Sequence, residues 1–311
     1  MEIIADSREF QVNRETAIAI GKFDGVHVGH RRLLEEILEK KAEGLAACVF
    51  TFDTSPAVLL GKSDGKVLTT REEKRRILQE IGVDLLVEFP MTPETMAMEA
   101  QEFALRILLG ALDAKMIAAG EDLSFGSRGL GNVQLLRKLS ETYHFDVDII
   151  PKVCIDGKEV SSTYIRGLLE QGKMEQVKSC LGEFYSVSGT VQHGHGIGHT
   201  LGFPTANLIP PSEKLLPPFG VYLSRVRVGE KFYDSISNVG KKPTVSGKEQ
   251  LGVESFLYDF EGDLYGREIE VFLHEYCRPE RKFENMEALK AQLKLDIEAG
   301  RRNFRTRSSQ K

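Results

Sequence analysis

The spacing of apolar residues changes near residue 184, and this change most limits what the 311-residue chain can fold into. Before that point, short apolar runs of the kind found in buried strands alternate with longer segments of helical periodicity. Strands separated by helical crossovers predict a parallel sheet with helices on both faces. The chain is also longer than the roughly 100–200 residues of one domain, so we expect two domains, at 1–183 and 184–311.

The first half therefore reads as an α/β domain of the Rossmann-like kind. Ligands of such domains bind at the carboxyl ends of the parallel strands, where the glycine-rich turns of this chain fall. The expected strands lie at 16–21, 46–52, 84–89, 114–120 and 146–150, and the expected helices at 29–43, 71–82, around 93–109, and at 132–143.

The second half consists mainly of extended segments rich in Val, Ile, Tyr and Phe, with glycine and proline between them. Short strands at this spacing predict an antiparallel barrel or sandwich. One amphipathic helix is expected at 285–299, and the polar, basic tail that follows it is expected to be frayed.

Charge and cysteine content exclude some classes of protein. A formal net charge of −5 argues against a protein that coats nucleic acid or an anionic membrane, so phosphates must be bound by local groups. No signal peptide is visible, and no apolar stretch approaches the ~20 residues needed to span a bilayer. We expect a cytoplasmic protein with reduced thiols, because the four cysteines are far apart: Cys48, Cys154, Cys180 and Cys277.

The segment GKFDGVHVGH, residues 21–30, follows the first expected strand and runs into a helix. Its glycines allow sharp turns and a close approach to a ligand. His27 and His30 are three residues apart at the mouth of the helix, where free amides and the helix dipole favour phosphate. Histidines that merely satisfy a tight turn are the alternative interpretation. The expected phosphate-binding residues of this segment are Gly21, Phe23, Asp24, Gly25, His27, Gly29 and His30.

Two further segments of the first half are candidate phosphate- or nucleotide-binding segments. SSTYIR opens a helix, where Ser162 and Thr163 offer hydroxyls and Arg166 a forked cation. An ordinary capped helix is the alternative for this segment. GEDLSFGSRGLGN, residues 120–132, is another glycine-rich turn after a strand, and it contains Asp122 and Phe125.

The most informative part of the second half is GTVQHGHGIGHTLGFPTANL, residues 189–208. A glycine loop that includes Gly194, Gly198 and Gly202 leads into Pro204, Thr205 and Asn207. Thr205 and Asn207 are two residues apart on a strand and so point to the same side. Their oxygens suit a magnesium ion already held by ATP phosphates. Three histidines in the loop (His193, His195 and His199) suggest zinc as an alternative, but no fourth ligand is evident.

Residues 18–300 resemble the prokaryotic bifunctional riboflavin kinase/FAD synthetases. Residues 21–30 match the flavin-type form of the HxGH nucleotidyltransferase signature, and residues 204–207 match the PTAN element of riboflavin kinases. The resemblance implies a nucleotidyltransferase domain followed by a six-stranded flavokinase barrel with a C-terminal helix. It also implies ATP-dependent phosphorylation of riboflavin to FMN, then adenylylation of FMN to FAD with release of pyrophosphate.

The resemblance further implies roles for single residues. His27, His30 and Arg166 would act in adenylyl transfer, and Asp122 and Phe125 would lie near ATP and flavin. Asn238, in a turn that matches the family, is a flavin-binding candidate. Glu254, within VESFLYDF, would be the general base that accepts the proton of the riboflavin 5′-hydroxyl, although a solvent-facing strand glutamate is the alternative. Mg²⁺ is the expected metal, and apo-flavoproteins are conceivable transient acceptors of the product.

The chain departs from the family pattern at Thr54 and Ser55, Leu123, and His199. The first three changes fall near the expected adenylylation pocket, and His199 stands where the family commonly has arginine. Two other functions compete with this interpretation. One is another adenylyl- or cytidylyltransferase, such as an enzyme acting on phosphopantetheine, but that class does not call for the PTAN loop. The other is a flavin- or nucleotide-binding regulator without catalysis.

Overall fold

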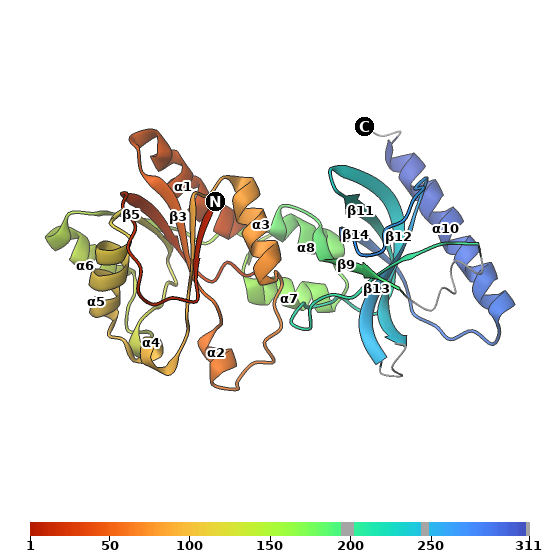
Figure 1. The fold of residues 1–311 in the computed structure, drawn as a ribbon, viewed down its shortest axis with the longest axis horizontal. Coiled ribbons are helices and arrows are strands. Elements are labelled where there is room, and N and C mark those ends of the chain that lie inside the picture. Colours follow the sequence, from red (N-terminus) through yellow and green to blue (C-terminus); the bar gives the residue numbers. More distant parts are fainter. Residues whose placement is uncertain (194–201, 244–248, 309–311) are drawn as a thin grey trace. The chain divides into compact units, whose positions relative to one another are not determined.

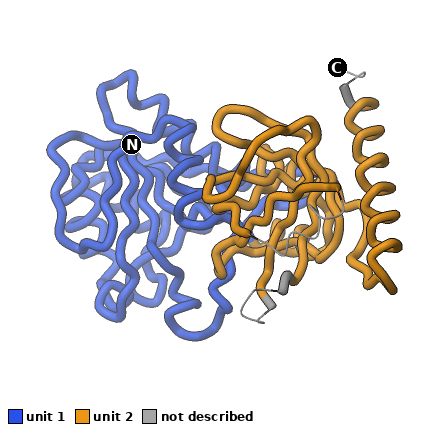
Figure 2. Tube along the Cα trace, turned by 45° about the vertical axis from the view of Figure 1, so that its right-hand side comes forward, with its two compact units in different colours: residues 1–162 blue, residues 163–311 orange. Residues whose placement is uncertain are grey.

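The computed structural model describes residues 1–193, 202–243 and 249–308. The chain folds into two compact units, 1–162 and 163–311, which Figure 2 distinguishes by colour. Among the described residues, no helix combines the length and the apolar character needed to cross a bilayer.

The first unit is built on a parallel sheet of six strands in the order β1-β4-β3-β2-β5-β6 (Figure 1). This arrangement confirms the predicted Rossmann-like class. The chain winds outwards from β2 through β3 to β4 and then returns to place β5 on the other side of β2. The carboxyl ends of β2 and β5 therefore flank the point where strand order reverses, which is where ligands of such sheets bind. The strands are β1 (Glu2–Ala5), β2 (Thr16–Ile20), β3 (Ala46–Phe52), β4 (Leu85–Phe89), β5 (Ala114–Gly120) and β6 (Asp146–Ile150).

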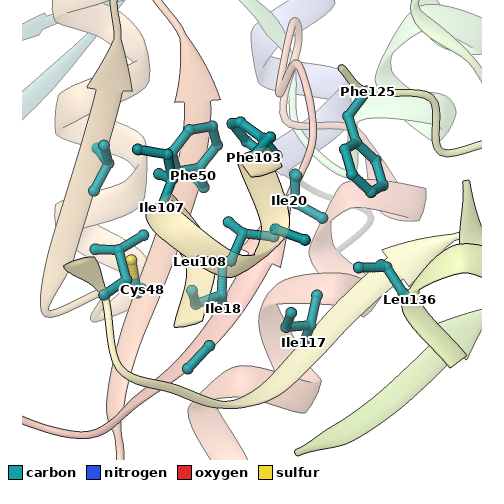
Figure 3. Close-up of a cluster of buried hydrophobic side chains, with 14 of the residues drawn as sticks. Ile18, Ile20, Cys48, Phe50, Phe103, Ile107, Leu108, Ile117, Phe125 and Leu136 are labelled. Carbon is teal, nitrogen blue, oxygen red and sulfur yellow. The ribbon is translucent and has the colours of Figure 1, made fainter. Parts of the chain in front are cut away.

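Alternate residues of the buried strands pack against different helices, because successive side chains of a strand point to opposite faces. Ala17 and Ala19 of β2 face α1 and α3, while Ile18 and Ile20 face α5, η2 and α6. Figure 3 shows the second of these two clusters. The helical segments of this unit are α1 (Val28–Glu39), η1 (Lys40–Glu43), α2 (Pro56–Leu59), α3 (Arg71–Ile81), α4 (Pro93–Ala97), α5 (Ala100–Phe103), η2 (Ala104–Ala111), η3 (Ser127–Gly129) and α6 (Val133–Tyr143).

The single helix expected around 93–109 is wrong in detail. The chain leaves the helical conformation at Met98 (ψ 129°), and residues 104–111 form a π-helix. The reason lies elsewhere in the sequence, since Ser127 N donates to Met98 O at 2.7 Å. A Cβ on Gly126 would meet the Ala100 backbone, so this interruption lets the glycine-rich turn pack closely on α5. The edge strand β1 was not predicted either.

The second unit contains a closed antiparallel barrel with the strand order β10-β13-β12-β11-β14-β9. This decides between the predicted barrel and sandwich in favour of the barrel. Two helices, α7 (Ser162–Glu170) and α8 (Met174–Leu181), precede it, and α7 begins at the boundary between the units. The strands are β9 (Tyr185–Gln192), β10 (Ala206–Leu208), β11 (Gly220–Val228), β12 (Lys231–Pro243), β13 (Glu249–Leu257) and β14 (Glu268–Pro279), and the short hairpin β7 (Cys154–Ile155) and β8 (Lys158–Glu159) lies in the first unit.

The C-terminal helix α10 (Met286–Ser308) is longer than the expected 285–299, and the prediction of a frayed tail is wrong. Phe304, in that tail, is only 9% exposed and packs against Tyr258 and Leu223. The Tyr258 hydroxyl donates to Ile297 O at 2.6 Å. One apolar side chain and one hydroxyl thus anchor the basic tail to the barrel.

Candidate active sites

The segment after β2 turns sharply, as its glycines predict. Gly25 has φ 91°, and two residues that are not glycine, Phe23 (φ 49°) and Val26 (φ 41°), also take up the left-handed conformation. Such a conformation is costly for residues with a Cβ and persists only where packing enforces it. Both side chains are fully buried among the residues that face α1 and α3. Packing against the sheet therefore stabilises the left-handed conformation of the loop.

Asp24 ties this loop to two distant parts of the first unit. Its Oδ1 accepts hydrogen bonds from Leu68 N at 2.8 Å and from Thr69 N at 3.2 Å. Its backbone carbonyl accepts from the Ser162 hydroxyl at 2.8 Å. The structure therefore brings together Asp24 and Ser162, which the sequence analysis placed in one site.

His27 is the N-cap of α1. Its Nδ1 accepts from His30 N at 3.3 Å. A neutral imidazole carries one proton, so an accepting Nδ1 leaves that proton on Nε2, which can donate to a ligand. A Cβ on Gly29 would lie 3.2 Å from the His27 ring. This tight approach explains a glycine inside the first turn of the helix.

The two imidazoles form one stacked pair, with ring centroids 3.7 Å apart and planes 16° from parallel. Burial lowers the pKa of His27 from 6.5 to about 4, against the opposing attraction of Asp24 and Asp122. Burial, followed by the proximity of His27 and Lys74, holds the pKa of His30 well below its usual value. The buried Nδ1 of His30 has no hydrogen-bond partner among the described residues. The pair is thus neutral, and it retains hydrogen-bonding capacity for a ligand.

Lys74, on α3, also belongs to this site and was missed by the sequence analysis. Its Nζ donates to the backbone carbonyl of Lys22 at 3.1 Å, and the buried Thr51 hydroxyl donates to the same carbonyl at 3.1 Å. The Lys74 charge is close enough to His30 to contribute to the lowered pKa of that imidazole. Within REEKRRILQEI, Lys74 looks like one more cation of a solvent-facing helix. Only the packing of α3 on this face of the sheet and the bond to Lys22 reveal its position.

The glycine-rich turn after β5 is fixed by an antiparallel bridge in which Phe125 N donates to Gly131 O at 3.0 Å and Gly131 N to Phe125 O at 2.8 Å. The Asp122 side chain is exposed, with Lys152 Nζ 4.0 Å from its Oδ2. Phe125, which is expected near flavin, is only 4% exposed. The centroids of the Phe125 and Phe103 rings are 5.5 Å apart in the core (Figure 3). The buried position of Phe125 favours a structural role in the glycine-rich turn.

Two of the positions that depart from the family pattern, Ser55 and Leu123, make local contacts in the first unit. The Ser55 hydroxyl accepts from Val58 N at 3.3 Å and caps α2. Leu123 packs at the edge of the same core as Phe125.

Thr163 and Arg166 lie in the first and second turns of α7, with Thr163 exposed and Arg166 half-buried.

In the barrel, three polar residues lie in one row across neighbouring strands. Asn207 of β10 pairs with Glu254 of β13, which pairs in turn with Asn238 of β12. Side chains in register on adjacent strands lie about 4.5–5.5 Å apart at Cβ and on one face. Thr205, just before β10, donates its hydroxyl to Glu254 Oε1 at 2.6 Å. The structure thus gathers four of the predicted kinase residues.

The opposite face of these strands lines the inside of the barrel. Ser237 and Ser255, each next to a residue of the row, are buried and share a hydrogen bond of 2.7 Å. Ser224 extends this chain of hydroxyls to Ser235. Since successive side chains alternate, the row containing Glu254 faces away from the barrel interior.

Part of the predicted nucleotide loop lies outside the described residues, namely Gly194, His195, Gly198 and His199. Of the rest, Gly202 has φ 85° and Pro204 is exposed. His193 stacks on Tyr265 with ring centroids 3.7 Å apart. The part of the chain that the structure describes contains no group of three His, Cys, Asp or Glu side chains suited to a metal ion.

Two family models match the chain in succession. The model for FAD synthetase matches residues 9–164, and the model for riboflavin kinase matches residues 181–304. The first match covers the loop of His27 and ends at Tyr164, two residues before Arg166. The second covers the barrel and most of α10.

Curated relatives match nearly the whole chain. A bifunctional riboflavin kinase/FMN adenylyltransferase from Escherichia coli K12 is 37% identical over 290 residues, or 92% of each protein. The enzyme of the same name from Listeria monocytogenes is 34% identical, again over 92% of each. A crystal structure described as a macrolide-efflux protein from Streptococcus pneumoniae is 30% identical with a TM-score of 0.83, covering 96% of this chain and 98% of that one.

Proposed function

The chain belongs to the bifunctional riboflavin kinase/FMN adenylyltransferase family, and from this premise we propose how its residues divide the two reactions. The protein phosphorylates riboflavin to FMN and joins FMN to the adenylyl group of ATP, forming FAD and pyrophosphate. We assign adenylyl transfer to residues 1–183 and phosphoryl transfer to residues 184–311. The row of Asn207, Glu254 and Asn238, completed by Thr205, is the observation that carries the kinase assignment.

Adenylyl transfer is supported by the stacked histidines at the start of α1. The phosphate oxygen of FMN attacks the α-phosphorus of ATP, the bond to the bridging oxygen breaks, and pyrophosphate leaves. Negative charge that builds on the phosphates needs fixed donors. His27 Nε2–H is such a donor, since His30 N occupies its Nδ1. The amides of the first turn of α1 add further donors. Ser162, Thr163 and Arg166 are the proposed ATP-binding residues of α7.

A neutral pair suits this task. Two imidazolium ions 3.7 Å apart would repel each other, whereas two neutral rings can stack and each present an N–H. Gly21, Gly25 and Gly29 let the phosphates approach the backbone. The buried Phe23 side chain anchors the loop to the core. Asp24 acts on the fold of the loop through Leu68 and Thr69. We propose Asp122, exposed at the next strand end, as a contact of the nucleotide.

Phosphoryl transfer is supported by the pairing of Thr205 with Glu254. The carboxylate of Glu254 orients the riboflavin 5′-hydroxyl and accepts its proton as that oxygen attacks the γ-phosphorus of ATP, with ADP as the leaving group. Gly202 and Pro204 belong to the proposed nucleotide loop. Asn238 lies beside Glu254 and contacts the flavin substrate in this proposal.

The donor set at β10 fits Mg²⁺. Thr205 offers a hydroxyl oxygen and Asn207 an amide oxygen, both hard ligands of the type that Mg²⁺ accepts when phosphates supply the rest. The Thr205 hydroxyl can donate to Glu254 and keep lone pairs for a cation. A bound Mg²⁺ would neutralise phosphate charge in this site.

The proposal includes a cytoplasmic location, where ATP is plentiful, and apo-flavoproteins as transient acceptors of FAD. A time course with riboflavin, ATP and Mg²⁺, with the flavins separated by chromatography, tests the two activities. FMN must appear first and FAD later. FMN alone would show that the first unit does not adenylylate, and neither product would favour a binding protein without catalysis.

A further inference from the structure

The amide of Asn238 is held in one orientation by a carboxylate from the end of another strand. Asn238 Nδ2 donates to Glu280 Oε1 at 3.0 Å, and Glu280 directly follows β14. An ionised carboxylate only accepts hydrogen bonds, so the atom of Asn238 that faces it must be the NH₂ group. This chemistry decides an amide orientation that atomic positions alone leave open.

The same orientation leaves Asn238 Oδ1 buried with no hydrogen-bond partner among the described residues. An unpartnered buried carbonyl costs free energy, and such an atom calls for a donor that the described residues do not supply. Asn238 is in register with Glu254, so the orphaned oxygen lies beside the proposed general base.

Gly240 makes room for this arrangement. A Cβ at this position would overlap the Glu280 carboxylate. Gly240 is two residues beyond Asn238 on β12, and the two positions lie on the same face of the strand. The Glu280 carboxylate therefore packs against the backbone of Gly240 and accepts the hydrogen bond from the Asn238 amide.

We propose that Glu280 is a positioning residue of the kinase site, which fixes Asn238 so that its Oδ1 accepts a hydrogen bond from a hydroxyl of the riboflavin side chain. This inference rests on the kinase function proposed above. Riboflavin carries several hydroxyls on one flexible chain. Glu254 takes the terminal hydroxyl, and Asn238 takes an inner one, which places the terminal oxygen for attack.

Kinetics of FMN formation by Glu280→Ala and Glu280→Gln test the role of Glu280. Without Glu280 the amide is free to turn its NH₂ group toward the substrate, so Glu280→Ala should raise KM for riboflavin about tenfold, the scale of one hydrogen bond to a buried group, and leave KM for MgATP unchanged. Glu280→Gln can still accept from Asn238 and should retain near-normal KM. Glu284→Ala removes a nearby exposed carboxylate as the matched control.

Three further measurements make the test specific. In an Asn238→Ala background, Glu280→Ala should add no further loss, because the two residues act in series. A riboflavin analogue that keeps only the terminal hydroxyl should be used equally well by Glu280→Ala and by the unmodified protein. Gly240→Ala, which displaces the carboxylate while keeping it present, should reproduce the effect of Glu280→Ala.

Additive losses in the double variant, an equal penalty with the analogue, or a change in KM for MgATP would each overturn the role assigned to Glu280. An unmodified protein that forms no FMN and does not quench riboflavin fluorescence would refute the kinase assignment itself. Conversion of supplied FMN to FAD by each variant, together with its circular dichroism, shows that the protein is folded.

Discussion

Thr205, just before β10, donates its hydroxyl to the carboxylate of Glu254 on β13, with 2.6 Å between Oγ1 and Oε1. The proposed metal ligand and the proposed base are therefore one hydrogen-bonded unit. The hydroxyl proton is committed to Glu254, so the Thr205 lone pairs are directed away from that carboxylate. A change at either residue disturbs both the base and the metal–nucleotide site.

Replacement of Thr205 tests this coupling. Thr205→Val keeps the shape of the side chain but removes both the donor and the metal ligand, and we expect FMN formation to fall by about a hundredfold or more. Thr205→Ser should keep most of the activity. Chromatographic assay of both reactions checks this, since conversion of supplied FMN to FAD should be unaffected. Normal FMN formation by Thr205→Val would remove this hydroxyl from the mechanism.

The histidine pair predicts a dependence of stability on pH. The folded-state pKa of His27 is about 4, below its unfolded value of 6.5, so the unfolded chain binds more protons between these pH values. Stabilisation from the neutral imidazole is complete above pH 6.5 and is lost as the pH falls toward 4. A shift of this size corresponds to about 3 kcal/mol.

Denaturant unfolding at pH 7.5 and pH 5 measures the part of this loss reached by pH 5, about 2 kcal/mol in the first unit. NMR titration of the ring protons reports the pKa. His27→Gln should reduce the loss at the lower pH. His144→Asn removes an exposed histidine as the control. A ring that titrates near pH 6.5 in the folded protein would contradict the burial argument.

Lys74 is predicted to support use of ATP in adenylylation. Lys74→Met removes the donor to the Lys22 carbonyl and a positive charge beside the phosphate site, and we expect KM for ATP to rise about tenfold. Lys74→Arg should recover most of the loss. Lys138→Met, at an exposed position of α6, is the control, and FMN formation should be normal in all three variants. An unchanged KM in Lys74→Met would place this lysine outside the site.

Residue spacing by itself could assign to one site only residues that are close together in the sequence, and the resemblance to a family supplied the distant ones. His27 and His30 share one turn, and Thr205 and Asn207 are two residues apart at the start of β10, so spacing alone predicts that each pair lies on one side. Lys74 and Glu280 reach their partners only through folding, across 52 and 42 residues respectively. No periodicity reveals such a contact, because each looks like an exposed charge in its own segment.

In the fold, too, local features were predictable from the sequence and features that depend on distant contacts were not. The alternation of strands and helices is local and predicted the parallel sheet. The interruption at Met98 was not predictable, because helical periodicity continues through it and only the distant contact with Ser127 breaks the helix. The tail was wrongly expected to fray, because a single phenylalanine among basic residues is weak evidence for packing.

The C-terminal tail provides the last prediction. Phe304 is largely buried against Tyr258, and a Cβ on Gly300 would overlap the Tyr258 hydroxyl, so the last turns of α10 are fitted to the barrel. Phe304→Ala should destabilise the second unit by about 3 kcal/mol, the lower end for a core phenylalanine. Phe304→Leu should cost clearly less. Urea unfolding followed by circular dichroism measures both, and a chain shortened by its last three residues is the control. Equal stability of Phe304→Ala and the unmodified protein would mean that the tail frays in solution after all.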